Sequence, residues 1–333
     1  MFLLLHKQKE NYPNYSFRAK MKLELLEYLL SLVIHIIKCL IQKNHIMSVF
    51  RKNYQHFLGY ALSGGGARGF AHLGALKVFE SYNLKPNILV GTSAGALAGV
   101  FYADGFTPDE IAELFQHRDF KDFVEFTVPK TGFFKSSGVE RFLKNNLRST
   151  TFEQLQIPFQ VVATDWQSGV VTVFSQGRTL IDSVVASCSV PLVFKPKEIG
   201  GVSYVDGGLL KNFPVSIIRD ECKFVIGVNV SLVMDLPEKE NMKNTAERVF
   251  KLMSNSNTLL DRELCDILVE TSSIERYFMF DLKSIDEIME LGYNTAADAM
   301  ASANSLRIVR RCHRYYELED KVKRKINSFK INA

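Results

Sequence analysis

From residue 56 onward, apolar runs alternate along this chain with segments of helical periodicity. His56 to Ser63 is an apolar run that ends in a glycine cluster, and a helical stretch follows it as far as Tyr82. A second apolar run, Asn87 to Gly91, leads into a helix of small residues that reaches Ala103. A strand, a tight turn and a helix, repeated in this way, predict parallel βαβ units.

The same alternation continues through the middle of the chain. It predicts further strands at Phe159–Thr164, Val170–Phe174 and Phe224–Val230, and helices at Pro108–His117, Val139–Asn146, Thr179–Ala186 and Pro214–Arg219. After Val230 the pattern becomes helical, with long segments near Lys243–Glu270 and Ile285–Lys325 that we expect to cover the sheet. The fold class predicted is therefore an α/β sandwich with a largely parallel central sheet.

The N-terminal segment has a different character. From Leu23 to Ile41, polar residues recur every three or four positions, which predicts an amphipathic helix. Its apolar run is shorter than the ~20 residues that a membrane-spanning helix needs, and it lacks the features of a signal peptide. Two interpretations stay open: an anchor lying in a membrane interface, or a segment 1–46 outside the natural protein, which would then start at Met47. We therefore divide the chain into an extension, 1–46, and one domain, 47–333, with a helical C-terminal region from about 240.

Composition excludes several classes of protein. With 333 residues, 47% hydrophobic and 23% charged, the chain is typical of a globular protein and not of a disordered or fibrous one. The five cysteines are odd in number and widely spaced, which favours reduced thiols and a cytoplasmic location. The chain has no CxxC pair, and its seven histidines are scattered, so no metal site is predicted.

The net charge of +5 is unevenly distributed. Basic residues predominate in segments 1–46 and 307–330, and the part between them is acidic overall. The basic ends suit peripheral contact with an anionic inner membrane surface, but they suit solvated helical faces equally well. Nucleic acid is not expected as a partner, because aromatic residues do not interleave with the basic ones. The sequence does not indicate an oligomeric state.

Two glycine-rich turns follow the first two predicted strands. Gly64–Gly69 satisfies the GxGxxG pattern of dinucleotide-binding folds, but the second strand ends without the acidic residue that such folds need. What remains is a loop of bare backbone N–H groups at a helix start, which suits a negatively charged oxygen. The second turn, Gly91–Gly95, is a GxSxG elbow that presents Ser93 as a candidate nucleophile.

A nucleophilic serine needs a base, and the usual histidine is missing from the expected place. The only histidine after residue 117 is His313, which lies among arginines in a basic helix. Asp206, followed by two glycines at a predicted strand end, is the better candidate, because glycines permit close approach of another loop. Asp165 and Asp182 are weaker alternatives, and an Asp-Gly pair can equally form a hairpin turn.

These motifs together resemble the patatin-like phospholipase family. Four motifs occur in the family's order within residues 57–230: the glycine loop, the GTSAG elbow at Ser93, the segment Ala186–Pro191 and Asp206-Gly207-Gly208. The resemblance implies a three-layer α/β/α fold and hydrolysis of lipid acyl esters by a Ser93–Asp206 dyad, without calcium or another cofactor. It also implies an oxyanion hole formed or framed by Gly64, Gly65, Gly66 and Arg68. A thioesterase or protease with the same dyad, and a noncatalytic lipid-binding protein, stay open as alternatives.

Other residues near these motifs have two interpretations each. We expect His72, one helical turn after Arg68, to brace the glycine loop. Arg68 itself could bind a phosphate head group or clamp the turn. Several phenylalanines could form an entrance for an acyl chain or a small extension of the core: Phe120, Phe123, Phe126, Phe133 and Phe134.

Overall fold

The structure is a computed structural model that describes residues 54–116, 118, 120–123, 125–126, 132–232, 242–271, 273–279 and 282–331. Residues 54–333 form one compact unit. The amphipathic helix predicted at 23–41 and the start at Met47 lie outside the described residues, so both stay predictions.

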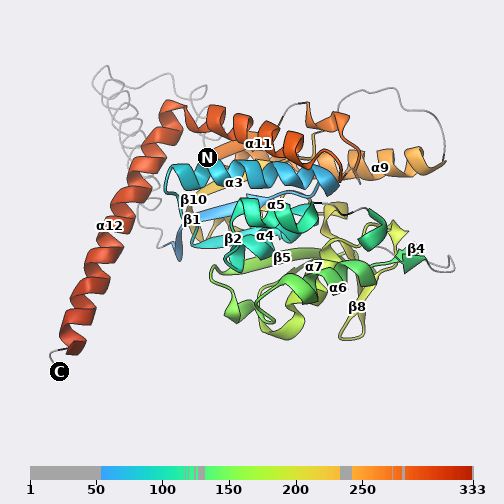
Figure 1. The fold of residues 1–333 in the computed structure, drawn as a ribbon, viewed down its shortest axis with the longest axis horizontal. Helices are drawn as coiled ribbons and strands as arrows, with labels where there is room; N and C mark the ends of the chain where they lie inside the picture. The colour runs from blue at the N-terminus through green and yellow to red at the C-terminus, as the bar shows by residue number, and fades with distance from the viewer. Residues whose placement is uncertain are drawn as a thin grey trace, which may run out of the picture. The chain divides into compact units, whose positions relative to one another are not determined.

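An eight-stranded sheet forms the centre of the unit (Figure 1). Its parallel part has the order β11-β10-β1-β2-β5. The strands β6 and β9 each pair antiparallel with β5, and β8 pairs antiparallel with β9. The parallel strands are β1 (His56–Leu62), β2 (Ile88–Thr92), β5 (Phe159–Asp165), β10 (Cys222–Asn229) and β11 (Ile267–Glu270). The antiparallel strands are β6 (Val171–Phe174), β8 (Lys197–Ile199) and β9 (Val202–Asp206).

Both faces of the parallel strands are buried, as continuous apolar runs require. In β1, Leu58, Tyr60 and Leu62 contribute to the larger core, whereas Ala61 between them contributes to a second core on the other face. Helices α3 (Phe70–Ser81), α4 (Ala94–Ala103) and α11 (Ile285–Met300) supply the larger core, and α8 (Val215–Arg219) covers the second. Figure 1 shows α3 and α11 side by side above the sheet. The predicted three-layer α/β/α fold is confirmed.

The remaining elements surround this sandwich. They are the helices α5 (Pro108–Phe115), α6 (Ser137–Asn146), α7 (Leu180–Ser187), α9 (Met242–Ser256), α10 (Leu259–Glu263) and α12 (Ala303–Ile331), and a small sheet of β3 (Glu125–Phe126), β4 (Gly132–Lys135) and β7 (Leu192–Phe194). In the part of the chain that the structure describes, no helix has the length and apolarity to cross a membrane. The described cysteines, Cys188, Cys222, Cys265 and Cys312, are free thiols, as predicted.

The prediction of a long helical segment at Lys243–Glu270 was wrong at its C-terminal end. Ile267–Glu270 is the strand β11, which pairs in parallel with β10 and buries Ile267 and Val269. A run of three apolar residues fits a strand or a helix equally well by periodicity, and here pairing with β10 favours the strand. The segment Ile285–Lys325 is also interrupted, because the Ser302 hydroxyl accepts the Ser305 N–H and starts a new helix.

Candidate active site

Ser93 occupies the sharp turn between β2 and α4, in a strained backbone conformation with φ 52° and ψ −119°. The flanking glycines permit this turn because neither position has room for a side chain. A Cβ at Gly91 would strike the Gly95 backbone, and a Cβ at Gly95 would strike the backbone of Leu62. Such strain costs about 1–3 kcal/mol and persists where the surrounding packing enforces it. The GxSxG motif therefore holds the serine above the carboxyl end of the sheet, as an elbow should.

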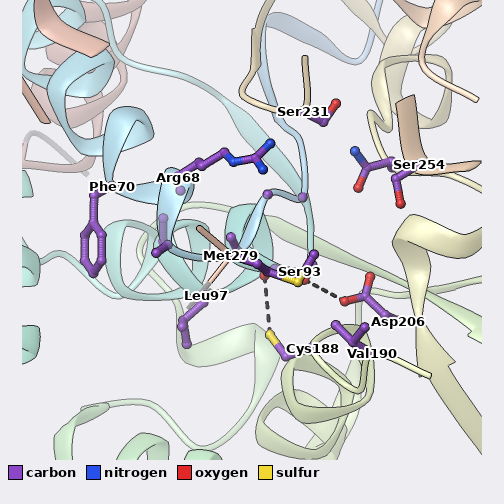
Figure 2. Close-up of a pocket in the computed structure, with 18 of the residues that line it drawn as sticks. Arg68, Phe70, Ser93, Leu97, Cys188, Val190, Asp206, Ser231, Ser254 and Met279 are labelled. Atoms are coloured by element: carbon purple, nitrogen blue, oxygen red, sulfur yellow. Dashed lines mark hydrogen bonds between the residues drawn. The ribbon is translucent and has the colours of Figure 1, made fainter. Parts of the chain in front are cut away.

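Asp206, at the end of β9, meets this serine next to β5, where β2 and β9 pair with consecutive residues of that strand (Figure 2). The Ser93 hydroxyl donates a hydrogen bond of 2.6 Å to Asp206 Oδ2, and both side chains are buried. Asp206 Oδ1 accepts the Gly208 N–H at 2.7 Å, so the aspartate begins the 3-10 turn Gly207–Leu209. The Asp-Gly pair therefore ends a strand and does not form a hairpin.

The surroundings of Asp206 change its acidity. Burial raises the pKa of this carboxyl from 3.8 to about 7, although the hydrogen bonds from Ser93 and Gly208 oppose the shift. A carboxylate with a pKa near neutrality can both take and return a proton under physiological conditions.

The alternative bases lie elsewhere. Asp165 Oδ1 accepts the backbone N–H groups of Gln167 and Ser168 in a turn. Asp182 pairs with Lys197 at 2.8 Å, and His313 Nε2 contacts the carbonyl of Tyr82. None of these three side chains lines the pocket around Ser93.

The glycine loop covers the serine. A Cβ at Gly64 would lie 3.1 Å from Ser93 Cβ, so the two backbones are in close contact. The Gly64 N–H donates to the Asn212 carbonyl at 3.0 Å and is not available to a ligand. Among the described residues, the N–H groups of Gly65 and Gly66 have no acceptor. Of the predicted oxyanion residues, Gly64 therefore positions the loop, and the next two glycines offer donors.

Arg68 and His72 hold this loop in place. Arg68 is buried, and its Nε–H donates to the Tyr277 carbonyl at 3.1 Å. This contact fits the interpretation of Arg68 as a clamp for the glycine turn. His72 is fully buried with Nε2 2.8 Å from the Ser63 carbonyl. Burial lowers the pKa of His72 to about 4, so the ring is neutral and Nε2–H donates. This contact matches the bracing role predicted for His72.

An apolar pocket of about 160 Å³ opens at Ser93 and Asp206. Its apolar lining includes Phe70, Leu73, Leu97, Ile111, Phe115, Phe123, Val139 and Phe194. Among the phenylalanines proposed as an entrance, Phe123 is buried against Phe115 and Phe142, so it belongs to both the core and the pocket wall. Phe134 is half-buried. The side chains of Phe120, Phe126 and Phe133 lie outside the described residues.

Sequence reasoning missed four residues that shape the site. Ser187 Oγ accepts the Ser93 N–H at 2.7 Å and donates to the Val162 carbonyl at 2.6 Å. Cys188 Sγ contacts the Ser93 carbonyl at 3.4 Å, and Ser254 Oγ donates to the Gly208 carbonyl at 3.0 Å. Asn212 also lines the pocket. For three of them the only sequence signal is proximity to motifs: Ser187 and Cys188 lie in Ala186–Pro191, and Asn212 follows Asp206 by six positions. Ser254 has no such signal.

The chain is an α/β protein with a GxSxG turn between a strand and a helix, the setting in which this motif occurs in serine hydrolases. The family model described as patatin-like phospholipase matches residues 60–218, so the family inferred from the sequence motifs is confirmed for this part of the chain.

Individual relatives are distant. The uncharacterized protein YqhO of Bacillus subtilis is 28% identical over 224 residues, which cover 57% of this chain and 77% of YqhO. Lysophospholipase NTE1 of Meyerozyma guilliermondii is 23% identical over 297 residues, covering 80% of this chain but only 21% of NTE1. Among solved structures, VipD from Legionella pneumophila has a TM-score of 0.49 at 13% identity, covering 82% of this chain and 77% of VipD.

Proposed function

We propose that this protein hydrolyses acyl esters of lipids, with Ser93 as the nucleophile and Asp206 as its base. The observation that carries the proposal is the 2.6 Å hydrogen bond between a strained elbow serine and a buried carboxylate. Membership of residues 60–218 in the patatin-like phospholipase family supports lipid acylhydrolase activity. The name of the relative NTE1, a lysophospholipase, points in the same direction.

The geometry supports a two-step acyl transfer. Ser93 Oγ attacks the ester carbonyl carbon while its proton passes to Asp206 Oδ2. The negative charge that develops on the carbonyl oxygen would be stabilised by the N–H groups of Gly65 and Gly66. As the intermediate collapses, Asp206 gives its proton to the leaving alcohol, and an acyl-enzyme forms at Ser93. Water then attacks the acyl carbon while Asp206 takes one of its protons. Asp206 returns this proton to Ser93 Oγ as the bond between Oγ and the acyl carbon breaks and the carboxylic acid leaves.

The pocket favours an acyl chain as the bound group. Its walls beyond Ser93 are aliphatic and aromatic, and burying such a chain gains about 0.8 kcal/mol per methylene group. An acyl thioester presents the same chain and the same carbonyl carbon to Ser93. A screen should therefore compare an ester and a thioester of one acyl group, beside lysophospholipids and diacyl phospholipids.

We also propose peripheral contact with a lipid surface through α9 and α10. Phe250, Lys251 and Ser254 of α9 line the pocket, while Val249 and Leu252 of the same helix are exposed. In the next helix along the chain, α10, Leu259 and Leu260 are 55% and 79% exposed. Exposed apolar side chains grouped next to a pocket are typical of a binding face.

Active-site labelling tests the proposed function. A serine-directed fluorophosphonate should label the wild-type protein, and Ser93→Ala should abolish both labelling and ester hydrolysis while the thermal unfolding midpoint stays close to that of wild type. Ser183→Ala is a matched control, because this buried hydroxyl on α7 bonds to the Leu180 carbonyl and does not line the pocket. Labelling that persists in Ser93→Ala would refute the assignment.

A further inference from the structure

Asn212 is held rigidly between the glycine loop and the Asp206 turn. It is 2% exposed and lines the pocket. Its backbone carbonyl accepts the Gly64 N–H at 3.0 Å, and its own N–H donates to Asn257 Oδ1 at 2.7 Å. The Asn257 side chain also donates to the Gly208 carbonyl at 3.0 Å. These contacts fix Asn212 relative to both halves of the site.

The carboxamide of Asn212 lies against two glycines of the site. A Cβ placed on either Gly64 or Gly208 would collide with Asn212 Oδ1. A Cβ on Gly64 would also lie 3.1 Å from Ser93 Cβ, and a Cβ on Gly208 would lie 3.0 Å from Asp206 Oδ1. The side chain is therefore seated next to both Ser93 and Asp206, and any residue other than glycine at these two positions would displace it.

The nitrogen of this carboxamide is the unusual atom. Asn212 Nδ2 is buried and has no acceptor among the described residues. Leaving such a donor unsatisfied costs about 1–3 kcal/mol, and native proteins rarely tolerate it without a functional reason. Two other side-chain amides have acceptors: Nδ2 of the buried Asn229 donates to Glu270 at 2.7 Å, and Nδ2 of the half-buried Asn257 donates to the Gly208 carbonyl at 3.0 Å.

We infer that Asn212 Nδ2 donates a hydrogen bond to the carbonyl oxygen of the bound substrate, as a third donor beside the N–H groups of Gly65 and Gly66. This inference rests on the proposed function. As Ser93 Oγ bonds to the carbonyl carbon, the π electrons of the C=O bond move onto the oxygen. An oxyanion can accept three hydrogen bonds, and fixed neutral donors stabilise it without reorganisation. A donor without a partner in the free protein fits this role because its bond forms only when substrate is present.

The test compares Asn212→Ala and Asn212→Asp with wild type on a soluble short-chain ester. We expect kcat to fall about 10²–10³-fold in Asn212→Ala, the range for loss of one oxyanion donor, with little change in KM. Asn212→Asp keeps the volume but replaces the donor with an acceptor, so its kcat should be lower still. The affinity for a trifluoromethyl ketone, which adds to Ser93 and carries an oxyanion, should fall in parallel with kcat. Asn229→Ala, which truncates a satisfied buried amide, should lower thermal stability without this selective loss.

Three results would overturn the inference. The first is a folded Asn212→Ala protein with kcat within threefold of wild type. The second is a rise in KM at constant kcat, which would indicate ground-state binding. The third is a displaced acidic limb of the pH–rate profile, which would mean that the amide acts on Asp206. Fluorophosphonate labelling that persists in Ser93→Ala would instead refute the proposed function, so the two failures are distinguishable.

Discussion

Replacing Asp206 with asparagine should change activity and stability in opposite directions. The substitution removes the proton acceptor of Ser93 with almost no change in volume. General-base catalysis contributes about 10²–10⁴-fold, so kcat should fall by at least that factor. The same change also removes a carboxylate that is buried in the folded protein and solvated in the unfolded one.

The magnitude of the stability change follows from the pKa of Asp206. Its value rises from 3.8 to about 7 on folding, so the folded state binds the proton more tightly between these two pH values. The stability contributed by this group is therefore present at low pH, falls as pH rises from about 4 to about 7, and is constant above that. About three pKa units correspond to roughly 4 kcal/mol, the cost of ionising Asp206 in its buried place.

Chemical denaturation at two pH values measures this cost. Asparagine does not titrate, so the variant's unfolding free energy lacks the pH dependence that Asp206 gives the wild type. As pH rises, the unfolding free energy of Asp206→Asn should therefore increase relative to that of the wild type. From pH 5 to pH 8 we expect growth of about 2–3 kcal/mol. His313→Gln is a matched control for activity, because this ring contacts the Tyr82 carbonyl and does not line the pocket. A difference that stays constant with pH would contradict the raised pKa, and near-normal kcat in Asp206→Asn would remove Asp206 as the base.

Two further predictions concern the surface and the domain boundary. A Leu259→Asp/Leu260→Asp variant should bind anionic vesicles more than tenfold more weakly in a sedimentation assay, since each buried leucine contributes about 1.5–3 kcal/mol, while kcat/KM on a soluble ester stays unchanged. The control variant is Leu318→Asp on α12, where the leucine is 61% exposed. If Leu318→Asp lowered vesicle affinity equally, the lipid contact would lie on the C-terminal helix instead. A protein beginning at Met47 should hydrolyse the soluble ester as well as the full chain, and an inactive or insoluble product would show that our boundary is wrong.

The order of elements was predictable because it depends on local pattern. Continuous apolar runs before glycine turns predicted β1 and β2, and the structure buries β2 along its whole length. β11 could not be predicted in the same way. Its four residues fit either secondary structure, and pairing with β10, forty residues away, decides between them.

The candidate site was predictable in its motifs but not in its contacts. The GxSxG and Asp-Gly-Gly patterns pointed to Ser93 and Asp206, because the glycines of both motifs lie where a side chain has no room. Asn212 carries no such signal, since an asparagine before a proline-containing loop is ordinary in sequence. Its place in the pocket depends on the Gly64 and Asn257 contacts, which only the assembled fold creates.

Strand β5 sets the distance between the two central residues. Thr92, which precedes Ser93, is in register with Val162 of β5, and Asp206 is in register with the next residue of that strand, Ala163. β2 runs parallel to β5 and β9 runs antiparallel to it, so the two side chains reach neighbouring positions from opposite directions. Ser187 adds a further link, because its hydroxyl joins the Ser93 N–H to the Val162 carbonyl. A slip of one residue along β5 moves a strand by about 3.3 Å and turns its side chains to the other face. The 2.6 Å bond between Ser93 and Asp206 would not survive such a slip, so the register of the sheet is itself a requirement of the site.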